Sequence, residues 1–152
     1  QMSNLSELYQ EMILEHNKNP RKVGKLTDTN AMAHGKNPLC GDDYFVYLQI
    51  SAHGRIEKVA FEGDGCAISK SSASMMTSAI QGKTVEEVQK IKDTFIHLLT
   101  DKEASDKLRE GSGRLRIFEG VRQYPVRVKC ATLSWRALEA ALQNNRNEIT
   151  TE

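Results

Sequence analysis

The chain has 152 residues, of which 39% are hydrophobic and 27% charged, and its formal net charge is +1. These values fit one globular domain with a sizeable core and exclude global disorder, and the near-neutral charge speaks against sequence-independent binding of nucleic acid. No apolar run is long enough to span a membrane and no secretory signal follows the start. We therefore expect a cytoplasmic protein with neither a membrane nor a nucleic acid as partner.

The expected domain covers residues 2–152. Gln1 precedes Met2 and is interpreted as the remnant of a tag, and the polar residues 144–152 are expected to form a frayed tail. The three cysteines are an odd number in a chain without an export signal. This favours metal ligands or redox thiols over a disulfide framework.

The first predicted helix covers residues 5–16, where hydrophobic residues recur at helical spacing and Asn4 and Glu7 are placed as a capping pair. Residues 17–37 are polar and aperiodic, so they are expected to form an irregular connection. The turn-like segment Asn37–Asp42 follows and carries Cys40.

Two strands are predicted next, over residues 44–50 and 56–61, because both stretches are rich in β-branched and aromatic residues. A turn at residues 52–55 joins them into a hairpin. The hairpin brings the Cys40 segment and the turn before Cys66 to the same end. Neighbouring strands are about 5 Å apart, so the two sulfurs can share one ion.

The second predicted helix runs from Cys66 to Gln81 and ends at Gly82. Thr84 and Glu87 form a capping box that begins the third helix.

Residues 101–123 are charged and contain glycine, so we interpret them as a surface excursion with one helical turn at 104–108 and an extended stretch at 115–118. Pro125 fits the first turn of a final helix. The predicted fold class is α+β, with a small antiparallel sheet of about three strands packed against several helices.

The turn at residues 63–66 is an unusual place for a thiol. Gly63 and Gly65 flank Asp64, and Cys66 then opens a helix made almost wholly of small residues. The N–H groups and the dipole at a helix N-terminus favour a thiolate, so this sulfur is expected to be reactive or bound to metal. The alternative is a buried structural cysteine, which behaves as a small hydrophobic side chain.

Together, Cys40, Asp42, Cys66 and Cys130 form a set of three thiolates and one carboxylate. Such a set matches tetrahedral zinc and also suits an iron–sulfur cluster, which prefers thiolates. The spacing is too wide for a zinc finger, so only a folded domain can bring the four together.

The histidines are weaker candidates for metal ligands. His16, His53 and His97 fit capping or solvated positions, and His34 is the one nearest Cys40 in sequence.

Four segments carry a resemblance to a known family. They are His16–Arg21 (HNKNPR), Asn37–Asp42 (NPLCGD), Gly63–Ser69 (GDGCAIS), which is followed by Ser72–Thr77 (SASMMT), and Pro125–Trp135 (PVRVKCATLSW). The chain resembles the IscU/SufU family of iron–sulfur cluster assembly proteins over nearly its whole length. The resemblance implies a SufE/NifU-like α+β fold.

Within that family the chain is more similar to the SufU branch. IscU scaffolds carry a histidine immediately before the third cysteine, whereas Lys129 precedes Cys130 here. Residues 124–127 also replace the chaperone-docking segment of the IscU scaffolds.

The resemblance implies a zinc-dependent sulfurtransferase that accepts persulfide sulfur from a SufS-type cysteine desulfurase and passes it toward a SufBCD-type complex. Carried over by position, Cys40 is the sulfur acceptor, and Asp42, Cys66 and Cys130 hold zinc with it. Arg127, one helical turn before Cys130, is a candidate partner contact or a plain surface charge. The alternatives are a scaffold for a [2Fe–2S] cluster and a structural zinc domain that binds a partner.

Overall fold

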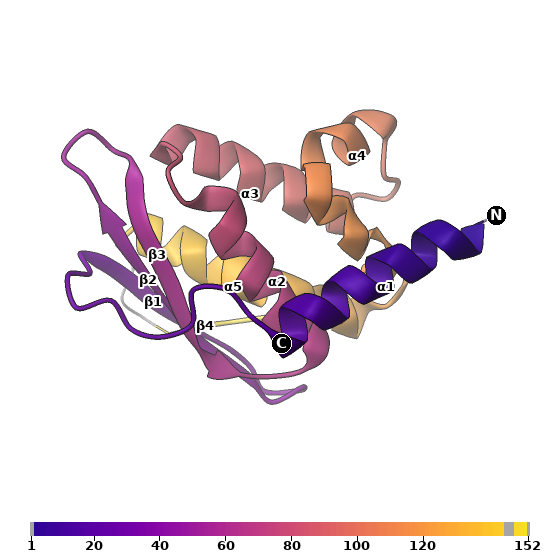
Figure 1. Cartoon of the computed structure of the whole chain (residues 1–152), viewed down its shortest axis with the longest axis horizontal. Coiled ribbons are helices and arrows are strands. Elements are labelled where there is room, and N and C mark those ends of the chain that lie inside the picture. Colours follow the sequence, from indigo (N-terminus) through magenta and orange to yellow (C-terminus); the bar gives the residue numbers. More distant parts are fainter. Residues whose placement is uncertain (1, 145–147, 152) are drawn as a thin grey trace.

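The computed structural model describes residues 2–144 and 148–151. A four-stranded sheet in the order β3-β2-β1-β4 packs on one face against helices α2 and α5, and α1 packs on α2 (Figure 1). The elements, in chain order, are α1 (Met2–Lys18), β1 (Ala31–Asn37), β2 (Asp42–Ile50), β3 (Ile56–Asp64), α2 (Ala67–Ile80), α3 (Val85–Thr100), α4 (Asp106–Ser112), the 3-10 helix η1 (Gly113–Gln123), α5 (Pro125–Leu142) and β4 (Ile149–Thr150).

The α+β class is confirmed, and the sheet is larger than expected. β2 pairs antiparallel with both β1 and β3, whereas the short β4 pairs parallel with β1, with Gly35 opposite Ile149. The prediction of a frayed tail is therefore wrong for residues 149–150, which form this fourth strand. Residues 145–147 and 152 of the predicted tail lie outside the described residues.

β1 is the main element that the sequence did not reveal, because residues 17–37 were expected to be irregular. Its side chains alternate between buried and half-buried, as in a strand with one face on the core. Gly35 has a packing reason, since a Cβ there would lie 3.0 Å from Cδ1 of Leu133 on α5. β1 and β2 thus form a second hairpin, and Cys40 lies in its turn.

The helix boundaries agree with most of the local signals. Cys66 is the N-cap of α2, and Thr84 and Glu87 form the predicted capping box of α3. Pro125 is the first residue of α5. The predicted Asn4 cap is wrong, because α1 begins at Met2 and Asn4 lies within the helix.

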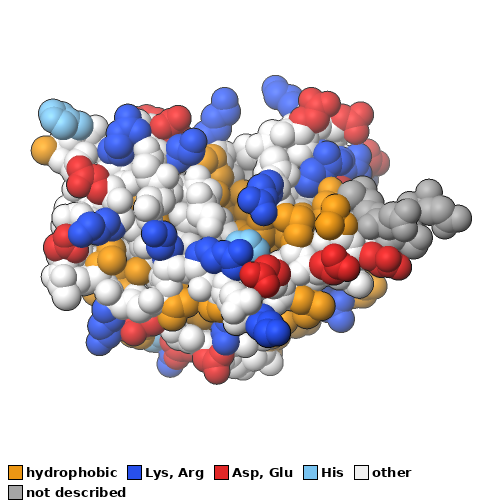
Figure 2. All heavy atoms as spheres, in the orientation of Figure 1, with side chains coloured by type: hydrophobic (Ala, Val, Ile, Leu, Met, Phe, Trp, Pro, Cys, Tyr) orange, Lys and Arg blue, Asp and Glu red, His pale blue; other side chains and the backbone are white. Residues whose placement is uncertain are grey.

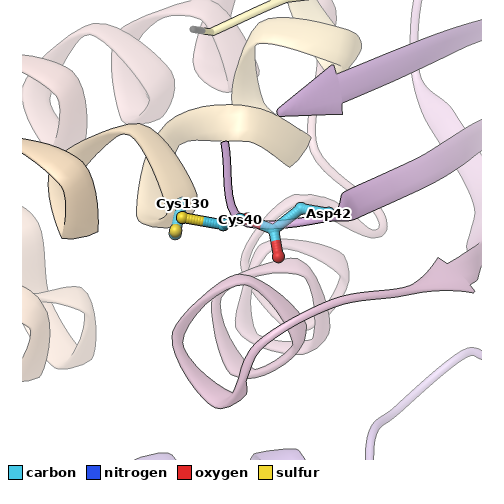
Figure 3. A group of neighbouring side chains, drawn as sticks. All are labelled: Cys40, Asp42 and Cys130. Carbon is cyan, nitrogen blue, oxygen red and sulfur yellow. The ribbon is translucent and has the colours of Figure 1, made fainter. Parts of the chain in front are cut away.

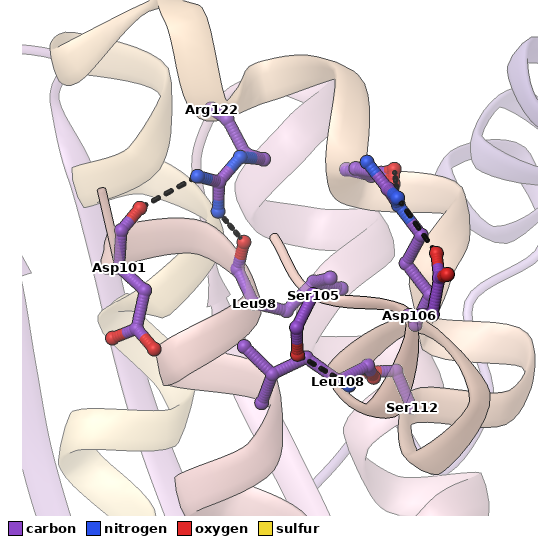
Figure 4. Close-up of polar contacts among 9 residues, drawn as sticks. Leu98, Asp101, Ser105, Asp106, Leu108, Ser112 and Arg122 are labelled. Carbon is purple, nitrogen blue, oxygen red and sulfur yellow. Dashed lines mark hydrogen bonds and ion pairs between the residues drawn. The ribbon is translucent and has the colours of Figure 1, made fainter. Parts of the chain in front are cut away.

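Residues 101–123 are not a surface excursion. Ser105 caps α4 by accepting a hydrogen bond from the Leu108 N–H, and Arg122 donates to the carbonyls of Leu98 and Asp101 at the end of α3 (Figure 4). The stretch at 115–118 is 3-10 helix rather than extended. Phe118 is fully buried and packs edge-on against Phe95 of α3, with 5.9 Å between the ring centroids.

The main core lies between the sheet and the helices. Trp135 on α5 is fully buried, packs against Phe95 with its ring tilted by 30° and 4.9 Å between the ring centroids, and donates its indole N–H to Ser72 on α2. On the face drawn in Figure 2, acidic and basic side chains are interspersed, with hydrophobic side chains visible between them. Within the described part of the chain, no helix is both long and apolar enough to cross a membrane.

We expect Phe118→Ala to lower the free energy of unfolding by about 3–5 kcal/mol, because it removes a fully buried ring and leaves a cavity against Phe95. Arg114→Ala, on an exposed position of the same 3-10 helix, should change it by less than about 0.5 kcal/mol. Chemical denaturation measures both values. If both variants lowered the free energy of unfolding by the same small amount, the 3-10 helix would contribute little to the core.

A second prediction concerns His16, which is buried rather than solvated and shares a 2.7 Å hydrogen bond between its Nδ1 and Ser74 Oγ of α2. Burial, and then the charge of Arg21, lower the pKa of His16 in the folded state. The unfolded state therefore takes up a proton first as the pH falls below about 6.5, so stability present above that pH is lost below it.

Chemical denaturation between pH 7.5 and 5.5 tests this prediction. We expect His16→Gln to flatten the decline in the free energy of unfolding, because glutamine can bond Ser74 but does not titrate. His53→Gln, at an exposed turn, should leave the slope unchanged. An identical slope in wild type and His16→Gln would contradict the prediction.

Candidate functional site

The Cys40 turn is closed by the pair Asn37 and Asp42, the last residue of β1 and the first of β2. The Cys40 N–H donates to the Asn37 carbonyl at 3.2 Å, and Gly41 has a φ of 72°, which a side chain would resist. Cys40 itself is half-buried. The turn thus carries a cysteine that is only partly buried.

The turn before Cys66 lies at the same end of the sheet, as predicted, because Asp43 of β2 pairs with Asp64 of β3. Gly63 has a φ of 135°, and a Cβ on it would lie 2.0 Å from the Asp43 carbonyl. A Cβ on Gly65 would lie 2.4 Å from Oδ1 of Asp42. Both glycines are required for this close approach of β2 to the turn.

Three of the four predicted ligands converge. The ligand atoms of Cys40, Asp42 and Cys130 all lie within 4.8 Å of one another, between the β1–β2 turn and the first half of α5 (Figure 3). Cys130 and Asp42 are buried, with 2% and 1% of their surfaces exposed. Two thiols and a carboxylate at this separation can hold a metal ion.

The Asp42 carboxylate uses only one of its oxygens in hydrogen bonds to the protein. Oδ1 accepts from the Cys66 N–H at 2.9 Å and from the Ser69 hydroxyl at 3.0 Å. Oδ2 is buried and has no hydrogen-bond partner among the residues that the structure describes. An unpartnered buried carboxylate oxygen is costly, and a cation at the site would satisfy it.

The Cys66 sulfur is not part of the three-residue group. It caps α2 and accepts the Ser69 N–H at 3.4 Å, and the residue is half-buried. Its backbone N–H nevertheless donates to Asp42, so Cys66 is hydrogen-bonded to the three-residue group through its main chain, while its thiol contacts Ser69.

The electrostatics of the group oppose a free thiolate at Cys130. Burial raises the pKa of the Cys130 thiol strongly, and the contacts with Cys40 and Asp42 raise it further. Without a cation this sulfur therefore carries its proton at neutral pH. A bound metal ion reverses this balance, because a coordinating thiol is deprotonated.

Three residues of the site escaped the sequence interpretation. Asn37 is fully buried and points its Nδ2 at the Cys130 sulfur, 3.7 Å away. Ser69 contacts Asp42, and Tyr44, also fully buried, contacts Ser69. Asn37 and Ser69 belong to the motifs around Cys40 and Cys66, so their polar side chains could have indicated a role at the site. Tyr44 follows the Cys40 motif, and its sequence context indicates only a strand residue.

The remaining candidates lie outside the group. His34 is held between Asp43, at 2.5 Å, and Glu148, at 3.2 Å. Arg127 is exposed on the first turns of α5, with its guanidinium carbon 4.7 Å above the centre of the Tyr124 ring.

Comparison with curated proteins gives relatives over most of the chain. The sequence is 41% identical over 137 residues to the zinc-dependent sulfurtransferase SufU of Bacillus subtilis (strain 168), an alignment covering 90% of each chain. It is 35% identical over 146 residues to the iron–sulfur cluster assembly scaffold protein IscU of Streptococcus pyogenes serotype M1, covering 96% of this chain and 89% of the relative.

Solved structures share the fold. The FiSufU protein of the SUF system from Fervidobacterium islandicum AW-1 superposes with a TM-score of 0.80 at 35% identity, over 87% of this chain and 94% of that one. The N-terminal part of a NifU-like protein from Brucella abortus superposes with a TM-score of 0.78 at 27% identity, over 90% and 93%. The family model of the NifU-like N terminal domain matches residues 8–151, and the chain therefore belongs to this family, as its cysteine motifs indicate.

Proposed function

We propose that this chain accepts persulfide sulfur from a SufS-type cysteine desulfurase and relays it, with zinc bound, to a SufBCD-type complex for iron–sulfur cluster assembly in the cytoplasm. One observation carries the proposal: two thiols and a buried carboxylate with an unpartnered oxygen meet at the β1–β2 turn. The 41% identity to a zinc-dependent sulfurtransferase supports it.

The donor set fits zinc. Cys40, Asp42 and Cys130 would hold the ion, and Cys66 is the proposed fourth ligand, because rotation about its Cα–Cβ bond moves the sulfur while its N–H stays on Asp42. Zinc is redox-inert, so when bound it keeps thiolates deprotonated without oxidising them.

Cys40 is the proposed acceptor because of its place in the fold. It lies in a turn between Pro38 and Gly41 and is half-buried, whereas Cys130 is buried within α5 and Cys66 caps α2. Of the three sulfurs, Cys40 is therefore the one that can turn outward with the least disturbance of regular structure.

The transfer itself is thiol exchange. The Cys40 thiolate attacks the outer sulfur of the donor's persulfide, forming a new S–S bond, while the bond between the donor's two sulfurs breaks and the donor cysteine leaves as a thiolate. No electrons are gained or lost overall, so the step requires no further oxidant or reductant.

Exposed hydrophobic residues adjoin two of the segments that carry the cysteines, which suits a protein partner. Leu39, Tyr124 and Val126 are large hydrophobic residues with 66%, 49% and 51% of their surfaces exposed. Leu39 adjoins Cys40, and the other two flank the start of α5, which also carries Arg127. We assign Arg127 to contact with the desulfurase.

A [2Fe–2S] scaffold is the second candidate, because thiolates are the preferred ligands of such clusters and the S. pyogenes relative is named a scaffold.

Metal content distinguishes the candidates. We expect aerobically purified protein to be colourless with about one zinc per chain, since the site offers one group of converging ligand atoms. Asp42→Asn should lower zinc affinity about tenfold or more, as measured by competition with a chromophoric chelator, because it removes the charge of a ligand. Asp43→Asn, the next residue on the opposite face of β2, should not.

Brown protein containing iron and labile sulfide would favour the scaffold and contradict the relay. Equal zinc affinity in the Asp42→Asn and Asp43→Asn variants would show that the carboxylate is not a ligand.

Sulfur transfer is tested by mass spectrometry after incubation with a cysteine desulfurase and cysteine. We expect one added sulfur on the peptide that contains Cys40, and its loss in Cys40→Ala together with loss of desulfurase stimulation. Asp43→Asn serves as the control and should carry the sulfur. Undiminished stimulation by a folded Cys40→Ala variant would leave a structural zinc domain as the remaining interpretation.

A further inference from the structure

We propose that Ser69 and Tyr44 are positioning residues: a directed hydrogen-bond chain from Tyr44 through Ser69 to Asp42 fixes which carboxylate oxygen faces the sulfurs. The inference rests on the proposed function, since it concerns how this chain prepares a metal ligand.

The chain consists of two short contacts between buried groups. The Tyr44 hydroxyl lies 3.0 Å from Ser69 Oγ, and Ser69 Oγ lies 3.0 Å from Oδ1 of Asp42. None of the three residues exposes more than 1% of its surface. Water therefore does not compete for these bonds, and each hydrogen must find its partner within the protein.

The direction of the chain follows from counting hydrogens. A tyrosine hydroxyl carries its proton at neutral pH, and Ser69 Oγ is its only hydrogen-bond partner among the described residues. Tyr44 therefore donates to Ser69.

Ser69 has one hydrogen to give and two acceptors at 3.0 Å, the Asp42 carboxylate and the Cys66 carbonyl. The Cys66 carbonyl already accepts the Lys70 N–H at 3.0 Å, and a carboxylate is the stronger acceptor. Ser69 therefore donates to Asp42.

The consequence is an oriented carboxylate. The terminal torsion of an aspartate side chain is broad and roughly two-fold, so packing alone does not decide which oxygen points where. The Ser69 hydroxyl and the Cys66 N–H together fix Oδ1, and Oδ2 is left unpartnered as the oxygen available to a metal ion. Residues that hydrogen-bond to the ligands of a metal ion orient those ligands in this way.

The packing around Gly65 independently supports the hydrogen-bond chain of Tyr44, Ser69 and Asp42. A Cβ at this position would lie 2.4 Å from Asp42 Oδ1, 2.5 Å from Ser69 Oγ and 2.9 Å from the Tyr44 hydroxyl. All three polar atoms thus pack against one glycine Cα, and any larger residue would push them apart.

The test measures zinc affinity by chelator competition in wild type, Ser69→Ala, Tyr44→Phe and the double variant. We expect Ser69→Ala to weaken zinc binding about tenfold or more, and Tyr44→Phe to weaken it less. In the Ser69→Ala background, Tyr44→Phe should cause no further loss, because Tyr44 acts through Ser69.

Two matched controls separate positioning from general damage. Ser71→Ala removes a buried hydroxyl of α2 whose only hydrogen-bond partners in the described part of the chain are the backbone carbonyls of Ala67 and Ile68, and Tyr47→Phe removes a hydroxyl of β2 that bonds Glu62. Both should bind zinc as wild type does. If Ser69→Ala does not fold, the isosteric Tyr44→Phe carries the test.

The absorption spectrum of cobalt-substituted protein provides a readout that would not change if Ser69 had only a structural role. In cobalt-substituted protein we expect Ser69→Ala to keep the sulfur-to-metal charge-transfer bands and to shift the d–d bands, because only the carboxylate ligand is disturbed. Zinc affinities within twofold of wild type in both variants, unshifted d–d bands, or additive losses in the double variant would overturn the inference while the proposed function stands. Failure of the wild type to bind zinc would overturn both.

Discussion

The site depends on one buried contact, in which the Asp42 carboxylate of β2 accepts the backbone N–H of Cys66. This bond joins the β1–β2 hairpin to the start of α2, and so brings together segments that are distant along the chain. A buried carboxylate is costly unless its charge is compensated. One oxygen is compensated by two donors of the protein, and the other is buried without a hydrogen-bond partner among the described residues, in a carboxylate group that lies beside the sulfurs of Cys40 and Cys130. The fold therefore stabilises one oxygen of the Asp42 carboxylate and leaves the other available to a cation.

The small residues of α2 make the approach possible. Ser72 donates to the Ala131 carbonyl of α5 at 2.6 Å, and Ser74 Oγ shares a hydrogen bond with His16 of α1 and accepts the Arg21 N–H. Short hydroxyl side chains allow α2 to lie close to both neighbouring helices, and the hydroxyls of Ser72 and Ser74 are hydrogen-bonded across these contacts. Since α5 carries Cys130, the contact of α2 with α5 also sets the distance between the two sides of the site.

Residues that cap or begin a helix predicted where three of the helices start. The capping box of Thr84 and Glu87, the proline at the start of α5 and the cysteine at the start of α2 all act within one helical turn, so their meaning does not depend on the rest of the fold. β1 could not be found in this way, because it has no β-branched residue and its Gly35 is explained by tertiary packing against Leu133 of α5 and Ile149 of β4. The local pattern of residues 115–118 predicts an extended stretch. Their 3-10 conformation accompanies burial against α3, a tertiary effect that a local pattern does not show.

The sequence predicted the identities of the metal-binding candidates, but their side-chain conformations follow from packing. Cys66 illustrates the difference, since its sulfur caps α2 while its N–H holds Asp42. These two roles use different atoms, so rotation of the thiol breaks its contacts with the N–H and hydroxyl of Ser69, whereas the Cys66 N–H stays on the carboxylate. Asp42 therefore keeps its backbone donor wherever the Cys66 sulfur lies. The carboxylate is the fixed member of the site, and the thiols of Cys40 and Cys66 are the members that can move.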